Sequence, residues 1–230
     1  SIMESMFDIL TDLPLFRGVT RERIAATVGM AKFHFLKYAP GETVAEAGEP
    51  CTHIKFVIDG SVSIAISNSD ERFKITQTLD APDVISPDFL FGSSTLYPGK
   101  VVALTQVSIV QITKQDYMKV LASDNIFMFN FLNYLSMNSQ KCIDGILALT
   151  NGTIEERLAM WIVSLTQPTA KDITIVCKQR DLYAMLGVQR SSYMAAIDHL
   201  VDMGVFAYRP GEIRVVDRKA VHAILRNGLE

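Results

Sequence analysis

The sequence has few cysteines and no long apolar run. Its three cysteines, Cys51, Cys142 and Cys177, lie far apart, which argues against a disulfide framework or a cysteine-based metal cluster and favours reduced thiols. No apolar run reaches the roughly 18 residues that a membrane-spanning helix needs, and no signal peptide is recognised. We therefore expect a cytoplasmic protein without membrane contact.

The chain also lacks a strong charge of either sign. Its formal net charge is −3 at pH 7, which does not by itself indicate a nucleic-acid partner. Residues 1–115 hold 10 Lys and Arg against 13 Asp and Glu, whereas residues 176–219 hold 7 against 5. The second segment is mildly basic, which is compatible with DNA binding. The chain has 230 residues, 49% of them hydrophobic, and so has room for one large or two ordinary domains with a real core.

The N-terminal half, over residues 32–112, is predicted to form short strands separated by turns. The stretch "HIKFVIDGSVSIAIS" contains two apolar runs around Asp59-Gly60, which is a strong hairpin signal. The stretch "VVALTQVSIVQI" alternates in polarity and is rich in β-branched residues. Many short strands with regularly spaced turns predict an antiparallel barrel or jelly roll.

After Lys114 the pattern becomes helical, and residues 123–150 predict one long helix. Seven positions recur at alternating spacings of four and three, which forms a heptad seam. These are Met128, Leu132, Leu135, Ser139, Cys142, Ile146 and Leu149. Phe127, Phe131, Tyr134 and Ile143 give a second apolar face. We expect one face to pack on the barrel and the other on a second copy; the alternative is one wide stripe buried in a single domain.

A break at Thr150-Asn151-Gly152 ends this helix, and Thr153 with Glu156 forms a capping box for the next one. The segment "KQRDLYAMLGVQRSSYMAAIDHLVDMGVF" then predicts two short helices joined at Gly187. The inward positions are Leu182, Leu186, Tyr193, Ile197 and Leu200. The following "VFAYRPGEIRVVD" predicts a hairpin around Pro210-Gly211. This is the pattern of a winged helix-turn-helix; a plain αα-hairpin packed on another domain is the alternative.

From Leu13 to Val216 the chain resembles the Crp–Fnr family of bacterial transcription regulators. The resemblance rests on "LPLFRGV", on "GEPCTHIKFVIDGSVSI", on the long helix, and on the Gly-x-x-Arg step at Gly187–Arg190. It implies an α+β chain in three parts. Residues 1–122 would form a jelly-roll sensor domain like that of cyclic-nucleotide-binding proteins, residues 123–150 a dimerisation helix and hinge, and residues 151–230 a winged helix-turn-helix domain.

The resemblance also implies a non-enzymatic homodimer that binds palindromic double-stranded DNA, with an effector in the barrel and RNA polymerase as a further partner. Arg190 matches the family's base-reading arginine. The implied DNA-binding set is Lys178, Gln179, Arg180, Gln189, Arg190, Ser191, Ser192 and Arg209. Where the family often has Glu and a second Arg, this chain has Ser191 and Ala195, so its operator should differ from that of the cyclic-AMP receptor.

The stretch "SPDFLFGSSTLYPGKVVAL", residues 86–104, matches the family's ligand loop. Nucleotide-binding members carry Gly-Glu, Arg-Ser and a helical Thr-Ser pair, where this chain has Ser86-Pro87, Val101-Val102 and Cys142-Ile143. No arginine occurs between residues 73 and 156. These losses argue against a cyclic nucleotide. The candidate effector pocket is Ser86, Asp88, Phe89, Lys100, Val101, Val102 and Cys142.

Other effectors are weighed by their ligand requirements. An iron–sulfur cluster needs four thiolates, which three cysteines cannot supply. Haem stays open, with His34, His53 or Cys51 as axial ligand, as do an apolar or weakly anionic metabolite and a barrel without a ligand. A cupin-type enzyme is not supported, because His34 and His53 lack a third ligand, and no nucleotide-binding or hydrolase motif occurs. A regulator acting only through protein contacts remains the alternative from another class.

Overall fold

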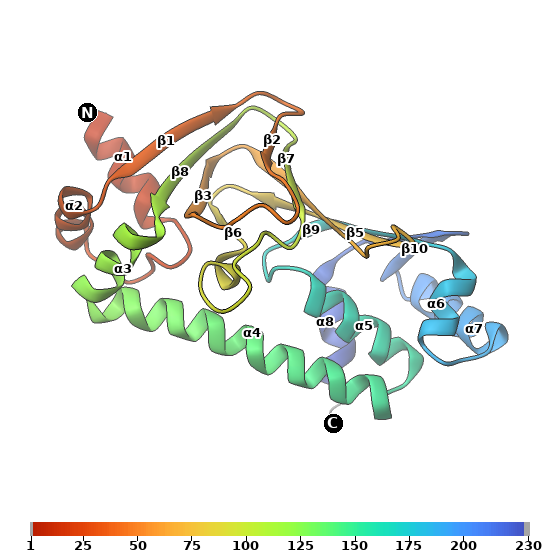
Figure 1. Cartoon of the computed structure of the whole chain (residues 1–230). Helices are drawn as coiled ribbons and strands as arrows, with labels where there is room; N and C mark the ends of the chain where they lie inside the picture. The colour runs from red at the N-terminus through yellow and green to blue at the C-terminus, as the bar shows by residue number, and fades with distance from the viewer. Residues whose placement is uncertain (1, 228–230) are drawn as a thin grey trace. The chain divides into compact units, whose positions relative to one another are not determined.

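The structure is a computed structural model that describes residues 2–227 (Figure 1). The chain forms two compact units. The first comprises the residues up to Ser63 together with Leu79–Met137, and the second comprises Ile64–Thr78 together with the residues from Asn138 onward. Two strands and one helix therefore run from one unit into the other. The predicted functional boundaries after residues 122 and 150 stay a prediction.

The first unit is an antiparallel β jelly roll with helices, as the sequence predicts. A four-stranded sheet has the order β1-β8-β3-β6, and β2 pairs with β7. The helices are α1 (Ile2–Thr11), α2 (Arg21–Met30), the short 3-10 turn η1 (Pro87–Phe89) and α3 (Lys114–Ser123). The strands are β1 (Phe33–Tyr38), β2 (Thr43–Ala45), β3 (His53–Asp59), β6 (Asp83–Ile85), β7 (Lys100–Ala103) and β8 (Val107–Thr113).

The predicted turn at Asp59-Gly60 is confirmed. It joins β3 to β4 (Ser61–Ser67), and Gly60 has a φ of +84°. A Cβ at this position would collide with the backbone carbonyl of Gln106, so the turn requires glycine for both conformation and space. After β4 the chain turns back into β5 (Phe73–Asp80), so that β4 and β5 form a second hairpin.

Aromatic rings join the sheet to the helices in the core of the first unit. The Phe16 ring lies edge-on between Phe56 of β3 and Phe127, with centroid distances of 5.5 and 5.2 Å. Phe127 and Phe131 belong to α4 (Asn125–Asn151) and are 1% and 3% exposed. The prediction that one face of the long helix packs on the barrel is therefore confirmed for these two rings.

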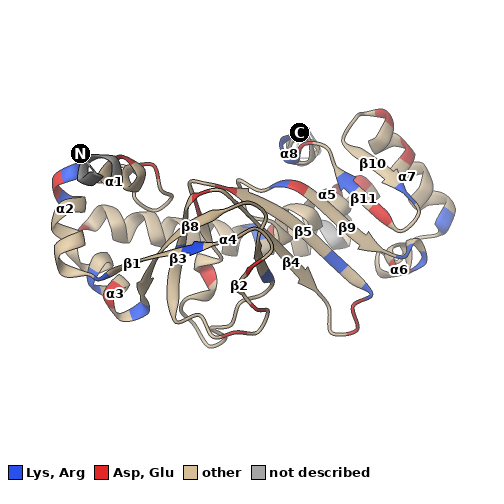
Figure 2. Cartoon of the chain, turned by 90° about the horizontal axis from the view of Figure 1, so that it is seen from above, with Lys and Arg blue, Asp and Glu red and all other residues tan. Residues whose placement is uncertain are grey.

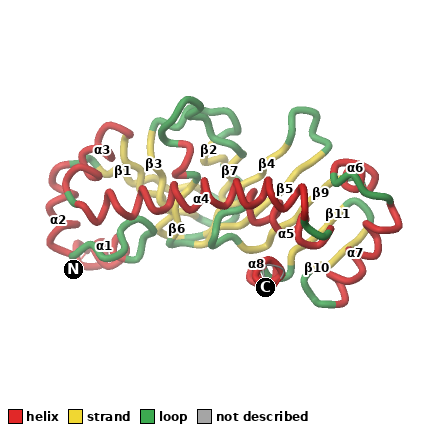
Figure 3. The backbone as a smooth tube through the Cα atoms, turned by 90° about the horizontal axis from the view of Figure 1, so that it is seen from below, coloured by secondary structure: helices red, strands yellow, loops and turns green. Residues whose placement is uncertain are grey.

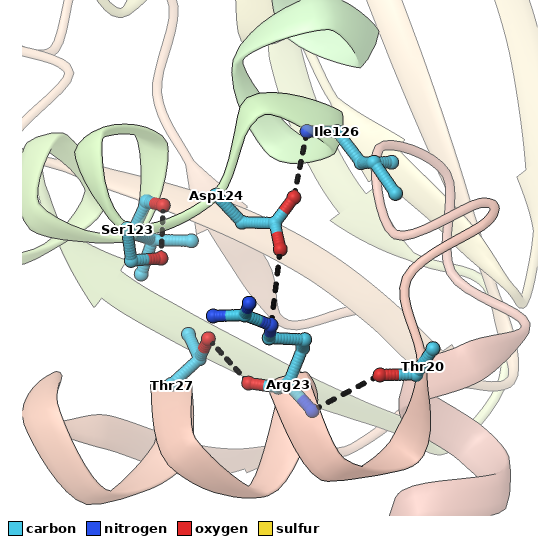
Figure 4. A network of polar contacts seen from close by, with 7 residues as sticks. Thr20, Arg23, Thr27, Ser123, Asp124 and Ile126 are labelled. Carbon is cyan, nitrogen blue, oxygen red and sulfur yellow. Dashed lines mark hydrogen bonds and ion pairs between the residues drawn. The ribbon is translucent and has the colours of Figure 1, made fainter.

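Asp124 fixes the start of α4 (Figure 4). Its carboxylate accepts a hydrogen bond of 2.7 Å from the Ile126 backbone N–H and pairs with Arg23 of α2 at 3.5 Å. Thr20 caps α2 by accepting from the backbone N–H of Arg23 at 3.3 Å. One carboxylate thus satisfies a free N–H of the long helix and ties it to the N-terminal helices.

The second unit is a winged-helix domain to which part of the β4–β5 hairpin is added. The strand order in this unit is β10-β11-β9-β5-β4, and all described pairs are antiparallel. Its helices are α5 (Ile154–Leu165), α6 (Gln179–Met185), α7 (Arg190–Asp202) and α8 (Arg218–Asn227). Its own strands are β9 (Lys171–Cys177), β10 (Phe206–Arg209) and β11 (Glu212–Val215).

The helix boundaries agree closely with those predicted from the sequence. Figure 3 shows α4 as one continuous helix. Thr153 then caps α5 by accepting from the Glu156 backbone N–H at 3.1 Å, so the predicted capping box is confirmed. The first helix of the helix-turn-helix begins at Gln179, two residues before the predicted Asp181. Within the described part of the chain, no helix combines the length and hydropathy that a bilayer crossing requires.

Candidate nucleic-acid interface

The helix-turn-helix is held together by the apolar positions that the sequence singled out. Leu182 of α6 is 2% exposed, and Tyr193 and Ile197 of α7 are both fully buried. Gly187 lies between the helices with a φ of +67°, the left-handed conformation that glycine adopts without a Cβ penalty. These residues fix α7 on α6 and leave the opposite side of α7 in solvent.

Four predicted DNA-binding residues meet at the N-terminal end of α7. Gln189 is the N-cap residue, and Arg190, Ser191 and Ser192 form the first turn. All four side chains are exposed. A helix N-terminus presents free backbone N–H groups and a partial positive charge, and Arg190 adds a guanidinium there. This end of α7 therefore has the chemistry to contact both phosphates and base edges.

Arg209 ends strand β10 of the wing, where it is ion-paired rather than a free cation. β10 and β11 pair with Arg209 opposite Glu212, and Gly211 in the turn has a φ of +84°. The Arg209 guanidinium is ion-paired with the Glu212 carboxylate. A phosphate would have to share or replace this partner.

The residues predicted to hold the DNA backbone take two different positions. Lys178, the N-cap residue of α6, and Arg180 in its first turn are exposed. Gln179 is half-buried: its amide donates to the Tyr208 hydroxyl of the wing and to the Met194 sulfur of α7, the latter at 2.7 Å. Gln179 thus links α6, α7 and the wing, and its contact with DNA stays a prediction.

Sequence reasoning missed a second residue that positions the helix-turn-helix. Arg157 of α5 donates from Nη1 to the backbone carbonyl of Leu186 at 2.9 Å. Leu186 is the C-cap residue of α6, so the guanidinium satisfies a carbonyl at the end of a helix. Neither this bond nor that of Tyr208 leaves a local pattern, because the partners are 29 residues apart in each case.

The charges on the helix-turn-helix and the wing are compatible with a modest electrostatic contribution to nucleic-acid binding. Lys and Arg on α6, α7 and the wing strands alternate with Asp and Glu (Figure 2). Such a surface favours contacts at particular positions over a broad basic footprint.

The predicted dimer seam on α4 exposes much of its apolar surface. Leu132 is 52% exposed, Ile146 63% and Met128 37%, and Ser139 and Cys142 are also exposed. Leu135 is half-buried, and the side chain of Leu149 lies outside the described residues. Four further apolar side chains on α4 are more than half exposed. These are Phe129, Met137, Ile143 and Leu147.

An exposed apolar stripe of this length on a helix is typical of a surface covered by another chain.

The predicted effector residues fall into two groups. Ser86, Asp88, Phe89, Lys100, Val101 and Val102 belong to the first unit, whereas Cys142 belongs to the second. Ser86 is 6% exposed, and its φ of +44° is unusual for a residue other than glycine. Lys100 forms an exposed ion pair with Glu46 at 3.9 Å, and Val101 is fully buried. Of the residues proposed for the pocket, Lys100 is therefore ion-paired and Val101 is packed in the core of the barrel.

Of the three residues weighed as haem ligands, His34 lies in β1, His53 begins β3, and Cys51 precedes β3 by two residues. The His34 and His53 rings are 6.2 Å apart, and the Nδ1 of His53 is hydrogen-bonded to the Thr52 hydroxyl at 2.7 Å. Burial raises the pKa of the Cys51 thiol to about 11, which disfavours its thiolate. Among the described residues, no three His, Cys, Asp or Glu side chains gather as a metal site would require.

Most of the barrel sequence matches a known protein-domain family. Residues 35–124 match the family model described as Cyclic nucleotide-binding domain. This segment contains the ligand loop, although that loop lacks the arginine and glutamate expected for a nucleotide. The sequence has no significant match among curated proteins.

Solved structures resemble the chain in fold. The catabolite activator protein of Thermus thermophilus is 16% identical, with a TM-score of 0.54 over 93% of this chain and 99% of that one. The sensor domain of the transcriptional regulator DNR from Pseudomonas aeruginosa is 17% identical, with a TM-score of 0.54 over 62% of this chain and 94% of that one. The c-di-GMP responsive global regulator CLP of Xanthomonas campestris is 17% identical, with a TM-score of 0.50 over 86% and 100%. The predicted fold is confirmed, and the resemblance to these regulators is a resemblance of fold.

Proposed function

We propose that this protein is a sequence-specific DNA-binding transcription regulator that acts as a homodimer on a palindromic operator. The observation that carries the proposal is the exposed end of α7, where Gln189, Arg190, Ser191 and Ser192 project from a helix packed on α6. A helix presented in this way fits the major groove, and the adjacent wing resembles that of winged-helix DNA-binding domains. The fold shared with solved regulators supports the same conclusion.

The exposed stripe of α4 supports the dimer. Two copies joined along this helix would be related by a two-fold axis, and the operator would repeat that symmetry in two half-sites about one helical turn apart. Lys178 and Arg180 would contact phosphates, whereas Arg190 would read a base. The barrel would hold an effector other than a cyclic nucleotide, because the ligand loop lacks the charged residues that bind ribose and phosphate. The proposal assigns no catalytic activity.

A gel-shift titration with the protein's own upstream region tests the function. We expect a discrete complex whose affinity falls steeply with salt, and a clear preference for that region over a scrambled duplex of equal length. Equal affinity for both duplexes would mean that the protein does not read sequence. No retardation at any salt concentration would instead favour a regulator that acts only through protein contacts.

A further inference from the structure

The β4–β5 hairpin, like helix α4, runs from one compact unit into the other. Residues 64–78 lie inside the segment that matches the cyclic nucleotide-binding domain, residues 35–124. The same residues, Ile64–Thr78, nevertheless belong to the compact unit of the winged helix. We call Ile64–Thr78 the hairpin segment. A piece of the sensor sequence is thus built into the DNA-binding unit.

The hairpin segment completes the sheet of the wing. Strand β5 pairs antiparallel with β9, with Phe73 opposite Cys177 and Ile75 opposite Ile175. The other edge of β9 pairs with β11 of the wing. After Cys177, β9 leads through Lys178 directly into α6. One strand therefore connects the hairpin segment with both the wing and the first helix of the helix-turn-helix.

The β5–β9 ladder has a bulge in β9, and Gln77 of β5 lies opposite it. The pairing shifts register between Thr76 and Thr78, and Gln77 at that point is 3% exposed. Its Nε2 donates to the carbonyl of Leu165 at 3.4 Å, and its Oε1 accepts from the backbone N–H of Gln167 at 2.8 Å. Leu165 is the last residue of α5, where carbonyls lack partners within the helix. Gln77 thus bridges the end of α5 and the residue two positions beyond its last helical residue.

An aromatic contact adds to this attachment. The ring of Phe73 lies against Trp161 of α5 with a centroid distance of 4.5 Å and an interplanar angle of 31°. Trp161 is the only tryptophan in the sequence. Its fluorescence therefore reports on whether the hairpin segment is attached.

We propose that the hairpin segment is a regulatory latch, whose attachment to β9 and α5 holds the winged helix in its DNA-binding conformation. The inference rests on the proposed function. Both hairpin strands continue into the first unit, through Ser61–Ser63 of β4 and through Leu79 and Asp80 of β5. A change of conformation in the barrel thus has a covalent, hydrogen-bonded route to β9.

The contacts also give the direction of the effect. The hairpin segment occupies an edge of β9 and one end of α5, whereas Arg190 and its neighbours on α7 remain exposed. Attachment therefore leaves the DNA-reading residues free. Without it, β9 would lose its hydrogen-bonding neighbour on the β5 side, and α5 would lose the Gln77 cap. Since β9 orders both the wing and α6, detachment should loosen the reading residues and weaken DNA binding.

Phe73→Ala tests the latch, with Ser67→Ala as the matched control. Ser67 is an exposed residue of the same hairpin, at the end of the strand that does not pair with β9. For folded Phe73→Ala protein, checked by a cooperative thermal transition, we expect Trp161 emission at longer wavelength and operator affinity about tenfold lower. Ser67→Ala should change neither. Shifted emission with unchanged or tighter DNA binding would overturn the latch, as would wild-type emission.

A reversible lock gives the converse test. Directly opposite residues of antiparallel strands have Cα atoms about 4.5–5.5 Å apart, within the range that a disulfide spans. Phe73→Cys should therefore form an intramolecular disulfide with Cys177 on oxidation with diamide. Cys142→Ser serves as both parent and reference, because it removes the exposed thiol.

The oxidised protein should bind operator as the parent does, and reduction should weaken binding about tenfold. Equal affinity of the oxidised and reduced forms, or no intramolecular disulfide, would overturn the latch. The emission and disulfide measurements need no DNA. If the parent binds no DNA at all, the proposed function fails while attachment of the hairpin segment is still decided.

Discussion

Gly145 of α4 lies directly against Ser164 of α5. A Cβ added to Gly145 would be 2.7 Å from the Oγ of Ser164, whereas its next neighbours would be at ordinary contact distances of 3.8 and 3.9 Å. The Ser164 hydroxyl is buried and has no hydrogen-bond partner. Nearby, Lys141 of α4 donates to the backbone carbonyl of Thr166 at 3.2 Å, which ties the same two helices together. The close approach thus places an unsatisfied hydroxyl opposite a glycine.

This arrangement predicts that the two positions are energetically coupled. Ser164→Ala should raise the free energy of unfolding by about 1 kcal/mol, because it removes an unpaired buried hydroxyl. Gly145→Ala alone should gain little, since the helix propensity of alanine, worth about 1 kcal/mol, is offset by the contact with Oγ. The double variant should exceed the sum of the two changes. Urea unfolding measures this, with the exposed Ser136→Ala as control; strict additivity would contradict it.

Features with a local pattern were predictable from the sequence. Gly60 and Gly187 marked turns that the structure confirms, and Thr153 with Glu156 marked the start of α5. The exposed end of α7 followed from helical periodicity, because the buried positions leave only one side of the helix to solvent. Such signals depend on neighbours within about one or two turns, so the sequence displays them directly.

Contacts between distant segments were not predictable. Gln77 and Leu165 are 88 residues apart in the sequence. Phe73 contacts Trp161 because β5 pairs with β9, and neither segment contains a local pattern that predicts this pairing. Lys100 was predicted as a residue of the effector pocket, and it pairs with Glu46, which follows β2. Each of these depends on which strand edges and helix ends become neighbours in the fold. A single sequence does not reveal that choice.

Cys142 offers a test of the dimer seam without any added label. It is exposed on α4, whereas Cys51 and Cys177 are 3% and 5% exposed. Side chains at seam positions of two parallel helices face their counterparts across the interface. Mild oxidation should therefore produce a disulfide-linked dimer on a non-reducing gel, and Cys142→Ser should abolish it. A wild-type protein that stays monomeric on the gel after oxidation would contradict the seam.

The apolar seam also predicts sensitivity to charge. Ile146→Asp would bring two like charges together in a surface that excludes water, because Ile146 is 63% exposed in one copy and would be covered in the dimer. Sedimentation analysis should show Ile146→Asp as a monomer at concentrations where the wild type is a dimer. Ser136→Asp, at an exposed position outside the seam, should remain dimeric. If both variants sediment like the wild type, the interface lies elsewhere.

Arg190 should determine sequence preference. Arg190→Ala should cost about 1–3 kcal/mol of discrimination at one base position in each half-site, because a bidentate contact to guanine is lost. Weak, salt-dependent binding to any duplex should persist through Lys178 and Arg180. Competition binding with single-base variants of the operator measures this. Arg72→Ala, on the hairpin tip where Arg72 pairs with Asp70 at 3.2 Å, is the matched control and should keep the wild-type preference.

His53 should make the stability of the protein depend on pH. Burial lowers the pKa of His53, and the neighbouring Lys55 and His34 lower it further. The unfolded chain therefore takes up this proton at a higher pH than the folded protein does. The contribution of neutral His53 is present above the ordinary histidine pKa of about 6.5 and is lost as the pH falls below it. Urea unfolding from pH 8 to pH 5.5 should show a smaller loss of stability for His53→Gln than for the wild type. Comparing each protein with itself at pH 8 removes the packing effect of the substitution, and parallel profiles would show that His53 does not carry the dependence.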